Sequence, residues 1–455
     1  MKNIYTKLCL SAIGCLMMAS CDFLDVVPQG TATVDDIYRT QYQAEGMVLS
    51  CYANIPNYFH PQQFPDFTGG NEIITSKGGT TRWFHFRSLV YGEESPTTTY
   101  YSLWSNTAKS YPQGAVKKAV WESIRNCYNV LNNLDRVSDI TPENLSWWKG
   151  EALFLIGYYH QIMLEYYGPI VIIDKEIPME SSPAEMMTSR SPYDTCVDFI
   201  ANKYSEAARL LPGVWDSSKR NRATSSAALA FKARLLLYAA SPLVNGNSEF
   251  YSDFKNKNGE LLFNSTYDRN KWLLAAEAAD KAAEMCEDGG RALVSGATGK
   301  KTDLLNKMAD IENMSFSRFN NSEYLLEWKY PSTFYQFILP RLVGDDDNFD
   351  SQALGCLSPS MKMVEMYYTA NGLPIDADIT WNYSNRYKLA SESSPVYEGV
   401  VPMNIDVVNL HLRREPRFYA CIAGDRMYWQ RGTNTADKDY NFLVKAHKGE
   451  EPWGT

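Results

Sequence analysis

The feature that most constrains the fold is a long helical pattern between Thr141 and Gly168. Thr141 is a residue type that caps helices, and Pro142 follows at the first turn, where proline is tolerated. Apolar side chains then alternate in steps of three and four residues, at Leu145, Trp148, Ala152, Leu155, Tyr159, Ile162 and Tyr166. Gly168-Pro169 is a helix stop. This segment therefore predicts one long helix.

The same reading predicts further helices throughout the first half of the chain. They run from Thr33, with Asp36 at the third position, to about Tyr52, from Trp121 to Val137, from Ser191 to Leu211, from Thr224 to Ser241, and from Trp272 to about Cys286. Alanine-rich faces on the last two allow close helix approach, as in stacked antiparallel pairs of the tetratricopeptide type. The repeat period is irregular, so we expect a degenerate scaffold within a mainly α fold.

The second half changes character beyond Gly289. It becomes rich in Asn, Asp, Gly, Pro and aromatic residues, and the helical period largely disappears. Tyr324 to Trp328 and Phe334 to Leu339 are candidate strands, and the rest is predicted as long loops laid over the helical scaffold. Ordered loops of that length are usually functional.

The first twenty residues have the layout of an export signal that is removed from the mature protein. Lys2 and Lys7 precede a mostly apolar stretch from Leu8 to Met18, which is too short to span a bilayer. Ala19-Ser20 supply the small residues that a peptidase needs, and Cys21 follows them directly, where a thiol accepts lipid. We therefore expect a lipoprotein that is anchored through Cys21 and not a plain secreted protein.

Composition and motifs exclude several classes of function. Removing Lys2 and Lys7 takes the formal charge from −9 to −11, which argues against a nucleic-acid ligand. The chain has no HExxH, GxSxG or GxGxxG motif, and its cysteines have no metal-ligand spacing, so neither an enzyme nor a cofactor is predicted. The acidic run from Asp345 to Asp350 lacks the glycine and glutamate of a calcium loop, so no metal is predicted either.

Several stretches resemble the SusD/RagB family of outer-membrane nutrient-binding lipoproteins of Bacteroidetes. They are Cys21-Asp22-Phe23-Leu24-Asp25, Glu151 to Tyr159 with Tyr167-Gly168-Pro169-Ile170, Ala227 to Leu243, Asn320 to Tyr324, Pro359 to Val364, Ala370 to Ile375, and Arg414 to Tyr419. The resemblance implies a SusD-like single domain in which helix pairs form the scaffold and the second half is loop-rich with few strands. Its parts would be the signal peptide at 1–20, a helical region at 21–290 and the family's C-terminal region at 291–455.

The resemblance also implies a function and partners. Such proteins capture a nutrient, typically a glycan, and act with a SusC-like TonB-dependent transporter in polysaccharide uptake, held on the outer membrane by their lipid anchor. Asp22 and Asp25 resemble the family's surface-export signal, which implies exposure on the cell surface; the periplasmic face is the alternative. Family members usually continue through another scaffold helix, so the sequence is either a truncated copy or incomplete at its end.

Glycan capture needs aromatic planes for sugar rings and polar side chains for hydroxyl groups. Two stretches combine both, and the ligand residues that we predict are Asp66, Asn71, Arg82, Trp83, His85, Arg87, Tyr91, Tyr101 and Trp104 in the first and Phe334 and Tyr335 in the second. Any one of these rings alone is better explained as a loop anchor packed on the scaffold. Two other functions remain open: binding of peptide or protein cargo, and a structural lid on the transporter without a glycan site.

Overall fold

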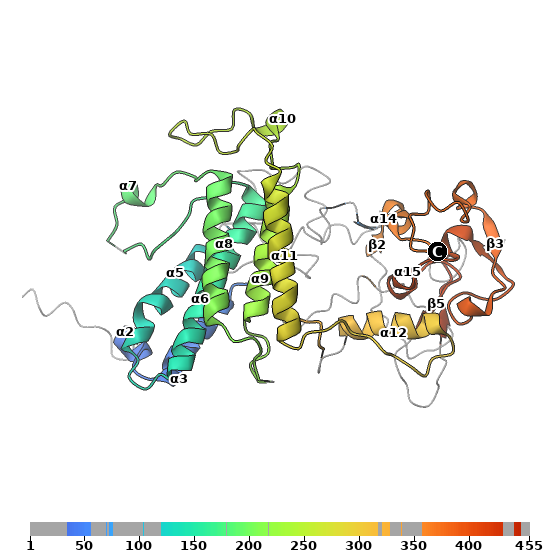
Figure 1. The fold of residues 1–455 in the computed structure, drawn as a ribbon, viewed down its shortest axis with the longest axis horizontal. Coiled ribbons are helices and arrows are strands. Elements are labelled where there is room, and N and C mark those ends of the chain that lie inside the picture. Colours follow the sequence, from blue (N-terminus) through green and yellow to red (C-terminus); the bar gives the residue numbers. More distant parts are fainter. Residues whose placement is uncertain are drawn as a thin grey trace, which may run out of the picture.

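The computed structural model describes residues 34–55, 70, 72–75, 103, 120–178, 180–216, 218–316, 321–327, 338, 357–430 and 441–446. The fold is mainly α, as predicted. Most of its helices form one array, and the remaining elements gather around a second core (Figure 1). Within the described ranges, no helix is both long enough and apolar enough to cross a bilayer.

Six helices form the array, and neighbours in the chain pack against one another. They are α3 (Gln41–Tyr52), α5 (Val120–Asn133), α6 (Pro142–Tyr167), α8 (Tyr193–Leu210), α9 (Ser225–Ala240) and α11 (Asn270–Asp288). Figure 1 shows α6, α8, α9 and α11 standing side by side. Short elements connect them, namely η4 (Leu134–Arg136), α7 (Pro183–Met186) and α10 (Ser248–Tyr251). Helix α6 is buried almost all round because α3, α5, α8 and α9 surround it.

The long predicted helix is confirmed at both ends. The Thr141 side chain accepts a hydrogen bond from the backbone N–H of Asn144, and Pro142 opens α6. Gly168 ends it with a φ of 68°, a left-handed conformation that glycine adopts without steric cost. The alanine-rich α9 also begins and ends where predicted, with Thr224 as its N-cap.

The first predicted helix is corrected by the structure. It consists of two helices, α2 (Val34–Ile37) and α3, separated at residues 38–40. Thr40 caps α3 by accepting a hydrogen bond from Gln43 N–H, and it has an extended backbone that a continuous helix cannot contain. The buried Tyr38 donates its hydroxyl to Asn129 on α5, which fixes the break against the array.

The second half contains a helix that the sequence reading missed, α12 (Asp303–Phe316). Thr302 accepts a hydrogen bond from Leu305 N–H, and Leu304, Leu305 and Met308 are buried. Residues 324–327 form no strand, contrary to expectation, and most of the stretch from Phe334 to Leu339 lies outside the described residues. The apolar residues of α12 repeat over only a few turns within a region rich in Asn and Asp, so the sequence pattern did not indicate a helix.

The rest of the second half is short elements around a second apolar core. The helical ones are α14 (Met361–Met366), α15 (Pro416–Cys421), η5 (Tyr383–Asn385), η6 (Pro395–Tyr397) and η7 (Asn409–His411). Strand β3 (Leu389–Ser391) pairs antiparallel with β4 (Asp406–Val408), and β5 (Tyr428–Gln430) pairs antiparallel with β6 (Asn441–Leu443). Their buried side chains and those of α12 form a cluster separate from the array core. We call the two parts the helical array and the C-terminal lobe.

One small sheet joins distant parts of the chain. Strand β1 (Ile73–Thr75) pairs antiparallel with β2 (Leu357–Pro359), with Ile74 opposite Ser358. Ser360, which follows β2, donates its N–H to the carbonyl of Glu72 at 2.9 Å and also caps α14. The segment around residue 73 is thereby attached to the C-terminal lobe.

Candidate functional site

The predicted ligand residues and the predicted lipid acceptor lie outside the described residues. This applies to Cys21, Asp66, Asn71, Arg82, Trp83, His85, Arg87, Tyr91, Tyr101, Trp104, Phe334 and Tyr335. Their roles therefore remain predictions, and the structure contributes the described residues on either side of them.

The first predicted ligand stretch has a described anchor near each end. At one end, β1 is held by β2 and by the hydrogen bond between Ser360 and Glu72. At the other end, Leu103 is fully buried, donates its N–H to the Tyr167 hydroxyl at 2.9 Å and accepts from Val120 N–H at 3.1 Å. One anchor is on the C-terminal lobe and the other is on α5 and α6. The chain between them thus connects the two cores.

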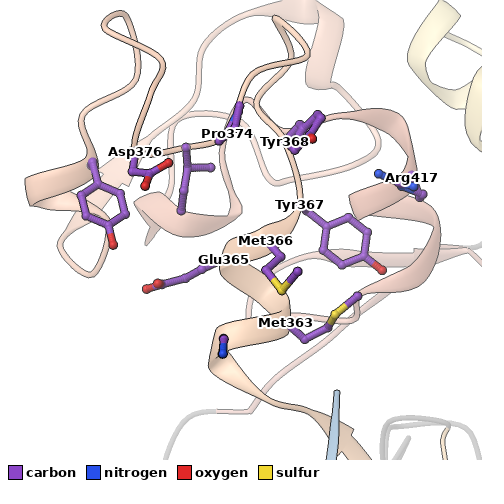
Figure 2. Close-up of a pocket in the computed structure, with 11 residues that line it drawn as sticks. Met363, Glu365, Met366, Tyr367, Tyr368, Pro374, Asp376 and Arg417 are labelled. Carbon is purple, nitrogen blue, oxygen red and sulfur yellow. The ribbon is translucent and has the colours of Figure 1, made fainter. Parts of the chain in front are cut away.

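A pocket of about 520 Å³ lies in the C-terminal lobe, around α14 and the turn that follows it (Figure 2). Its apolar lining comes from Met363, Met366, Pro374, Ile375 and the tyrosines 367, 368 and 383, and its charged lining from Lys362, Glu365, Asp376 and Arg417. The volume is within the range of small-molecule sites. We call this hollow the α14 pocket.

Arg414 holds the carboxyl end of α14 in place. Its guanidinium donates to the carbonyls of Val364, Tyr367 and Tyr368, at 2.9, 2.7 and 3.3 Å, and to that of Leu410 at 2.7 Å. Carbonyl groups at a helix end lack helical partners, so one buried guanidinium with several donors can satisfy them together. Burial lowers the pKa of Arg414 to about 10, because the charged form is desolvated.

The turn on the other side of the pocket is organised by Asp378. This buried carboxylate accepts hydrogen bonds from the hydroxyls of Thr369 and Thr380, from Thr380 N–H and from the Asn371 amide. These donors, the Thr369 hydroxyl first, hold the pKa of Asp378 well below its usual range. Gly372 completes the turn with a φ of 73°. Pro374 and Ile375 are thereby placed in the pocket wall.

The charged side chains around the pocket differ in whether they already have hydrogen-bond or ion-pair partners within the protein. Glu365 accepts from Arg386 at 2.7 Å and from the Tyr387 hydroxyl, and these partners outweigh its partial burial and lower its pKa. Arg417 donates through Nη2 to Glu415 at 3.0 Å. Within the described part of the chain, Lys362 and Asp376 form no side-chain hydrogen bond or ion pair, and both are exposed. These two side chains are therefore available to a ligand.

A second hollow, of about 470 Å³, lies between α3 and the loop before α9 and includes Glu45, Lys219 and Arg222. Arg222 is 5% exposed and donates to both oxygens of the fully buried Glu151, at 2.8 and 2.6 Å. Tyr52 donates to the same carboxylate at 2.7 Å. Burial raises the pKa of Glu151 in spite of Arg222 and Tyr52, which lower it. This satisfied network fastens α3, α6 and the start of α9 together, which is a structural role.

Comparison with known proteins shows which family the chain is similar to. Residues 66–237 match the sequence model of a SusD-like family that is described as starch-binding and associating with the outer membrane. Among solved structures, the chain is similar to a protein named BT4246, with a TM-score of 0.71 and 27% identity, covering 89% of this chain and 68% of that one. Over residues 66–237 the chain is therefore similar in sequence to the SusD-like family.

A second solved structure agrees with the chain in fold. A SusD-like protein from Bacteroides fragilis NCTC 9343 superimposes with a TM-score of 0.55 at 18% identity, covering 86% of this chain and 63% of that one. The chain thus spans about two thirds of the length of these solved proteins. No match was found among curated proteins.

The C-terminal stretches that marked the SusD-like resemblance meet at the α14 pocket. Met363 and Lys362 come from the stretch 359–364, Pro374 and Ile375 from the stretch 370–375, and Arg417 from the stretch 414–419. Sequence reasoning used these stretches only as marks of the family and missed the pocket. The apolar and charged residues at 362–367 were the available signal, but their convergence with Arg417 depends on tertiary contacts.

Proposed function

We propose that this SusD-like chain is a glycan-binding lipoprotein that acts with a SusC-like TonB-dependent transporter in nutrient uptake at the outer membrane. The observation that carries the proposal is the match of residues 66–237 to a family described as starch-binding and associating with the outer membrane. A solved SusD-like protein shares the fold over 86% of the chain, which supports a SusD-like fold beyond the matched residues. A binding role also agrees with a sequence that lacks the enzyme motifs considered above.

The ligand site that we propose is the predicted stretch with Asp66, Asn71, Arg82, Trp83 and Trp104, together with the other predicted residues. All of them up to Trp104 fall inside the region of the family match. Two anchors support this choice, because β1, which follows Asn71, is paired with β2 of the C-terminal lobe, and Leu103, which precedes Trp104, is bonded to the array. Loops that carry ligand residues need such rigid supports.

The membrane attachment that we propose runs through lipid on Cys21, with the body exposed on the cell surface. An acyl chain contributes about 0.8 kcal/mol per buried methylene, so two or three chains anchor a protein stably. Cys21→Ala is expected to abolish labelling by radioactive palmitate and to release the protein from the membrane fraction. Protease added to whole cells should cleave the wild-type protein; protection until the outer membrane is broken would assign it to the periplasmic face.

Affinity electrophoresis tests the ligand and its site together. The protein without residues 1–20 is run through gels that contain one polysaccharide each, beside a Trp83→Ala/Trp104→Ala double variant. Each ring stacked on a sugar contributes about 1 kcal/mol, so the double variant should lose roughly tenfold or more in affinity. Retardation on one polysaccharide that the double variant lacks is the expected result.

The matched control is Trp272→Ala, which removes a 39% exposed tryptophan of α11 outside the proposed site. It should migrate like the wild type, and circular dichroism should show that all variants are folded. If the folded wild-type protein migrates freely on every gel, the glycan proposal is wrong. If Trp272→Ala loses retardation and the double variant keeps it, a glycan is bound at another surface.

A further inference from the structure

Two buried cysteines lie side by side in the core of the helical array. Cys51 is on α3 and Cys127 is on α5, two helices that pack against each other. Both are free thiols in the structure, and their exposed fractions are 1% and 0%. The Cys51 sulfur lies 3.5 Å from the Met47 carbonyl, and a side-chain hydrogen bond joins the two cysteines.

The contacts on either side show how α3 and α5 are aligned. Tyr38, before α3, donates to Asn129 near the end of α5 at 2.8 Å. Asn54, after α3, donates to Ser123 near the start of α5, also at 2.8 Å. The two helices therefore run antiparallel. One cysteine comes three residues before Asn54 and the other four residues after Ser123, and steps of three and four residues return to the same helix face. The alignment thus places the two thiols opposite each other.

A third cysteine of the array core has different neighbours. Cys196 is also fully buried, but its sulfur lies 3.7 Å from the Ile170 carbonyl and 3.5 Å from that of Ser191. A small apolar core residue explains Cys196 fully. Cys51 and Cys127 each have the other's thiol as a neighbour, which is the arrangement that a disulfide requires.

We propose that Cys51 and Cys127 form a disulfide bond in the exported protein, which joins α3 to α5 covalently. Disulfides form and persist outside the reducing cytosol, so the proposal uses the expected export of the chain. It does not depend on glycan binding, and either proposal can fail without the other.

The reaction needs an oxidant that itself carries a disulfide, either a protein or a small molecule. One thiolate of the pair attacks the oxidant's disulfide and displaces a thiolate, and the second thiolate then attacks the mixed disulfide. Two electrons pass to the oxidant, which becomes two thiols, and the pair loses two protons. Burial raises the pKa of Cys127 well above its usual value, so little thiolate exists in the folded protein. The exchange therefore takes place during folding, before α3 and α5 enclose the pair.

The bond would connect the two helices between which the first predicted ligand stretch lies in the sequence. Residues 66–104 all fall between Cys51 and Cys127. A crosslink between positions so far apart removes much of the freedom of the unfolded chain and so favours the folded state. The scaffold on both sides of the ligand stretch would thereby be stabilised.

Peptide mapping without reduction tests the proposal on the wild-type protein. The full chain is produced with its signal peptide, collected from the cell envelope, unfolded in urea with N-ethylmaleimide, digested and weighed by mass spectrometry. A linked pair of peptides that contain Cys51 and Cys127 should appear and should separate on reduction. Cys196 is the matched control, because alkylation of this equally buried thiol shows that unfolding exposed the core. Alkylation of both Cys51 and Cys127 in this sample would overturn the proposal.

A second sample tests the geometry independently of where the cell places the protein. The chain without residues 1–20, with Cys21→Ala to remove the lipid-acceptor thiol, is unfolded, reduced and refolded in mixed reduced and oxidised glutathione. The same linked pair should form, whether or not the protein binds a glycan. Its absence from the folded product would show that α3 and α5 do not bring the two sulfur atoms within bonding distance.

Thermal unfolding measures what the bond contributes. Refolding with a reductant in place of glutathione should lower the midpoint of the wild-type transition by about 5 °C or more. In Cys127→Ala the reductant should cause no such shift, because the bond cannot form. Cys196→Ala, which removes a buried thiol outside the pair, should keep the wild-type shift. An equal shift in the wild type and in Cys127→Ala would overturn the proposal.

Discussion

Gly150 is a position where one missing methyl group allows two helices to meet. A Cβ built at Gly150 of α6 would lie 2.9 Å from Leu211 Cγ and 3.1 Å from Leu210 Cβ. A Cβ atom 2.9 Å from another heavy atom is essentially never observed, and Leu211 is buried, so its side chain has little room to move away. The close contact of α6 with the end of α8 therefore depends on glycine.

Gly150→Ala is expected to lower the free energy of unfolding by about 1–2 kcal/mol, because the strain of overpacking exceeds the gain in helix propensity. Gly46→Ala on α3 is the control, since a Cβ there meets no atom within 4 Å. This control should be neutral or stabilising by up to about 1 kcal/mol. Urea unfolding measures the free energy of unfolding of both variants. If Gly150→Ala were stabilised as much as Gly46→Ala, the close contact between α6 and the end of α8 would be contradicted.

His160 is a residue of the apolar core. Its ring is fully buried, with Nδ1 2.7 Å from the Ile156 carbonyl and Nε2 accepting from Ile173 N–H at 3.1 Å. These contacts fit the neutral ring. Burial lowers the pKa of His160 to about 4.

A lowered histidine pKa makes the folded state lose stability in acid. In the unfolded chain His160 is protonated below about pH 6.5, whereas in the folded protein it is protonated only below about pH 4. The free energy of unfolding is therefore unaffected by His160 above about pH 6.5 and decreases as the pH falls from 6.5 to 4. The loss amounts to roughly 3 kcal/mol. In His160→Gln this contribution should disappear. Urea unfolding at pH 7 and pH 4.5 compares the two proteins, and an equal acid sensitivity would show that His160 is not responsible.

At the scale of elements, Arg222 connects three helices through Glu151. It lies before α9 and bonds to Glu151 on α6 and to Glu45 on α3. Glu45 is partly exposed, whereas Glu151 has no contact with solvent and depends on Arg222 and Tyr52 for its hydrogen bonds. Removing one partner of a buried pair leaves the other without compensation.

Arg222→Gln is accordingly expected to cost about 3–5 kcal/mol of stability at neutral pH. Without Arg222 the pKa of Glu151 should rise further, so protonation should restore part of the stability as the pH falls from 7 to 5. Arg220→Gln is the control, because its pair with Glu327 is partly exposed and contributes about 0–1 kcal/mol. Thermal unfolding at both pH values measures the effect; a pH-independent loss would contradict this role of Glu151.

At the scale of the whole molecule, the array and the C-terminal lobe have separate apolar cores. Buried residues of α3 to α9 form one cluster and those of α12, α14 and α15 contribute to the other. Arg414 is central to the second, because it bonds to four carbonyl groups and lies 4.4 Å from the centroid of the Phe418 ring. A substitution of Arg414 should therefore destabilise the C-terminal lobe and leave the helical array unaffected.

Arg414→Met should cost about 3 kcal/mol in the C-terminal lobe, since buried carbonyls lose their donor. Amide hydrogen exchange followed by mass spectrometry should then show roughly 100-fold faster exchange in peptides from 357–430, with little change in α6 and α8. Lys388→Met, an exposed residue of the same lobe, is the control. Equal acceleration in both parts would mean that the two cores unfold as one unit.

The helical elements of the array could be predicted because their signals are local. Thr141, Pro142 and Gly168 act on backbone groups within four residues, and an apolar period of three to four residues requires only the helix itself. The same reasoning wrongly continued α3 through Tyr38, where the contact with Asn129, ninety-one residues away, accompanies a break. It also missed α12, whose apolar face is short and packs against α15 and η6 of the C-terminal lobe.

What the sequence by itself determined was the mainly α scaffold, the ends of α6 and α9, and the resemblance to the SusD-like family. The predicted ligand residues lie outside the described part of the chain and remain predictions. Only the tertiary structure decided that stretches near 362, 374 and 417 form one pocket, and that Arg414 holds α14. The physical reason is that such contacts join groups about fifty residues apart, as between Arg414 and Val364. The sequence around one partner therefore does not indicate which residue is the other.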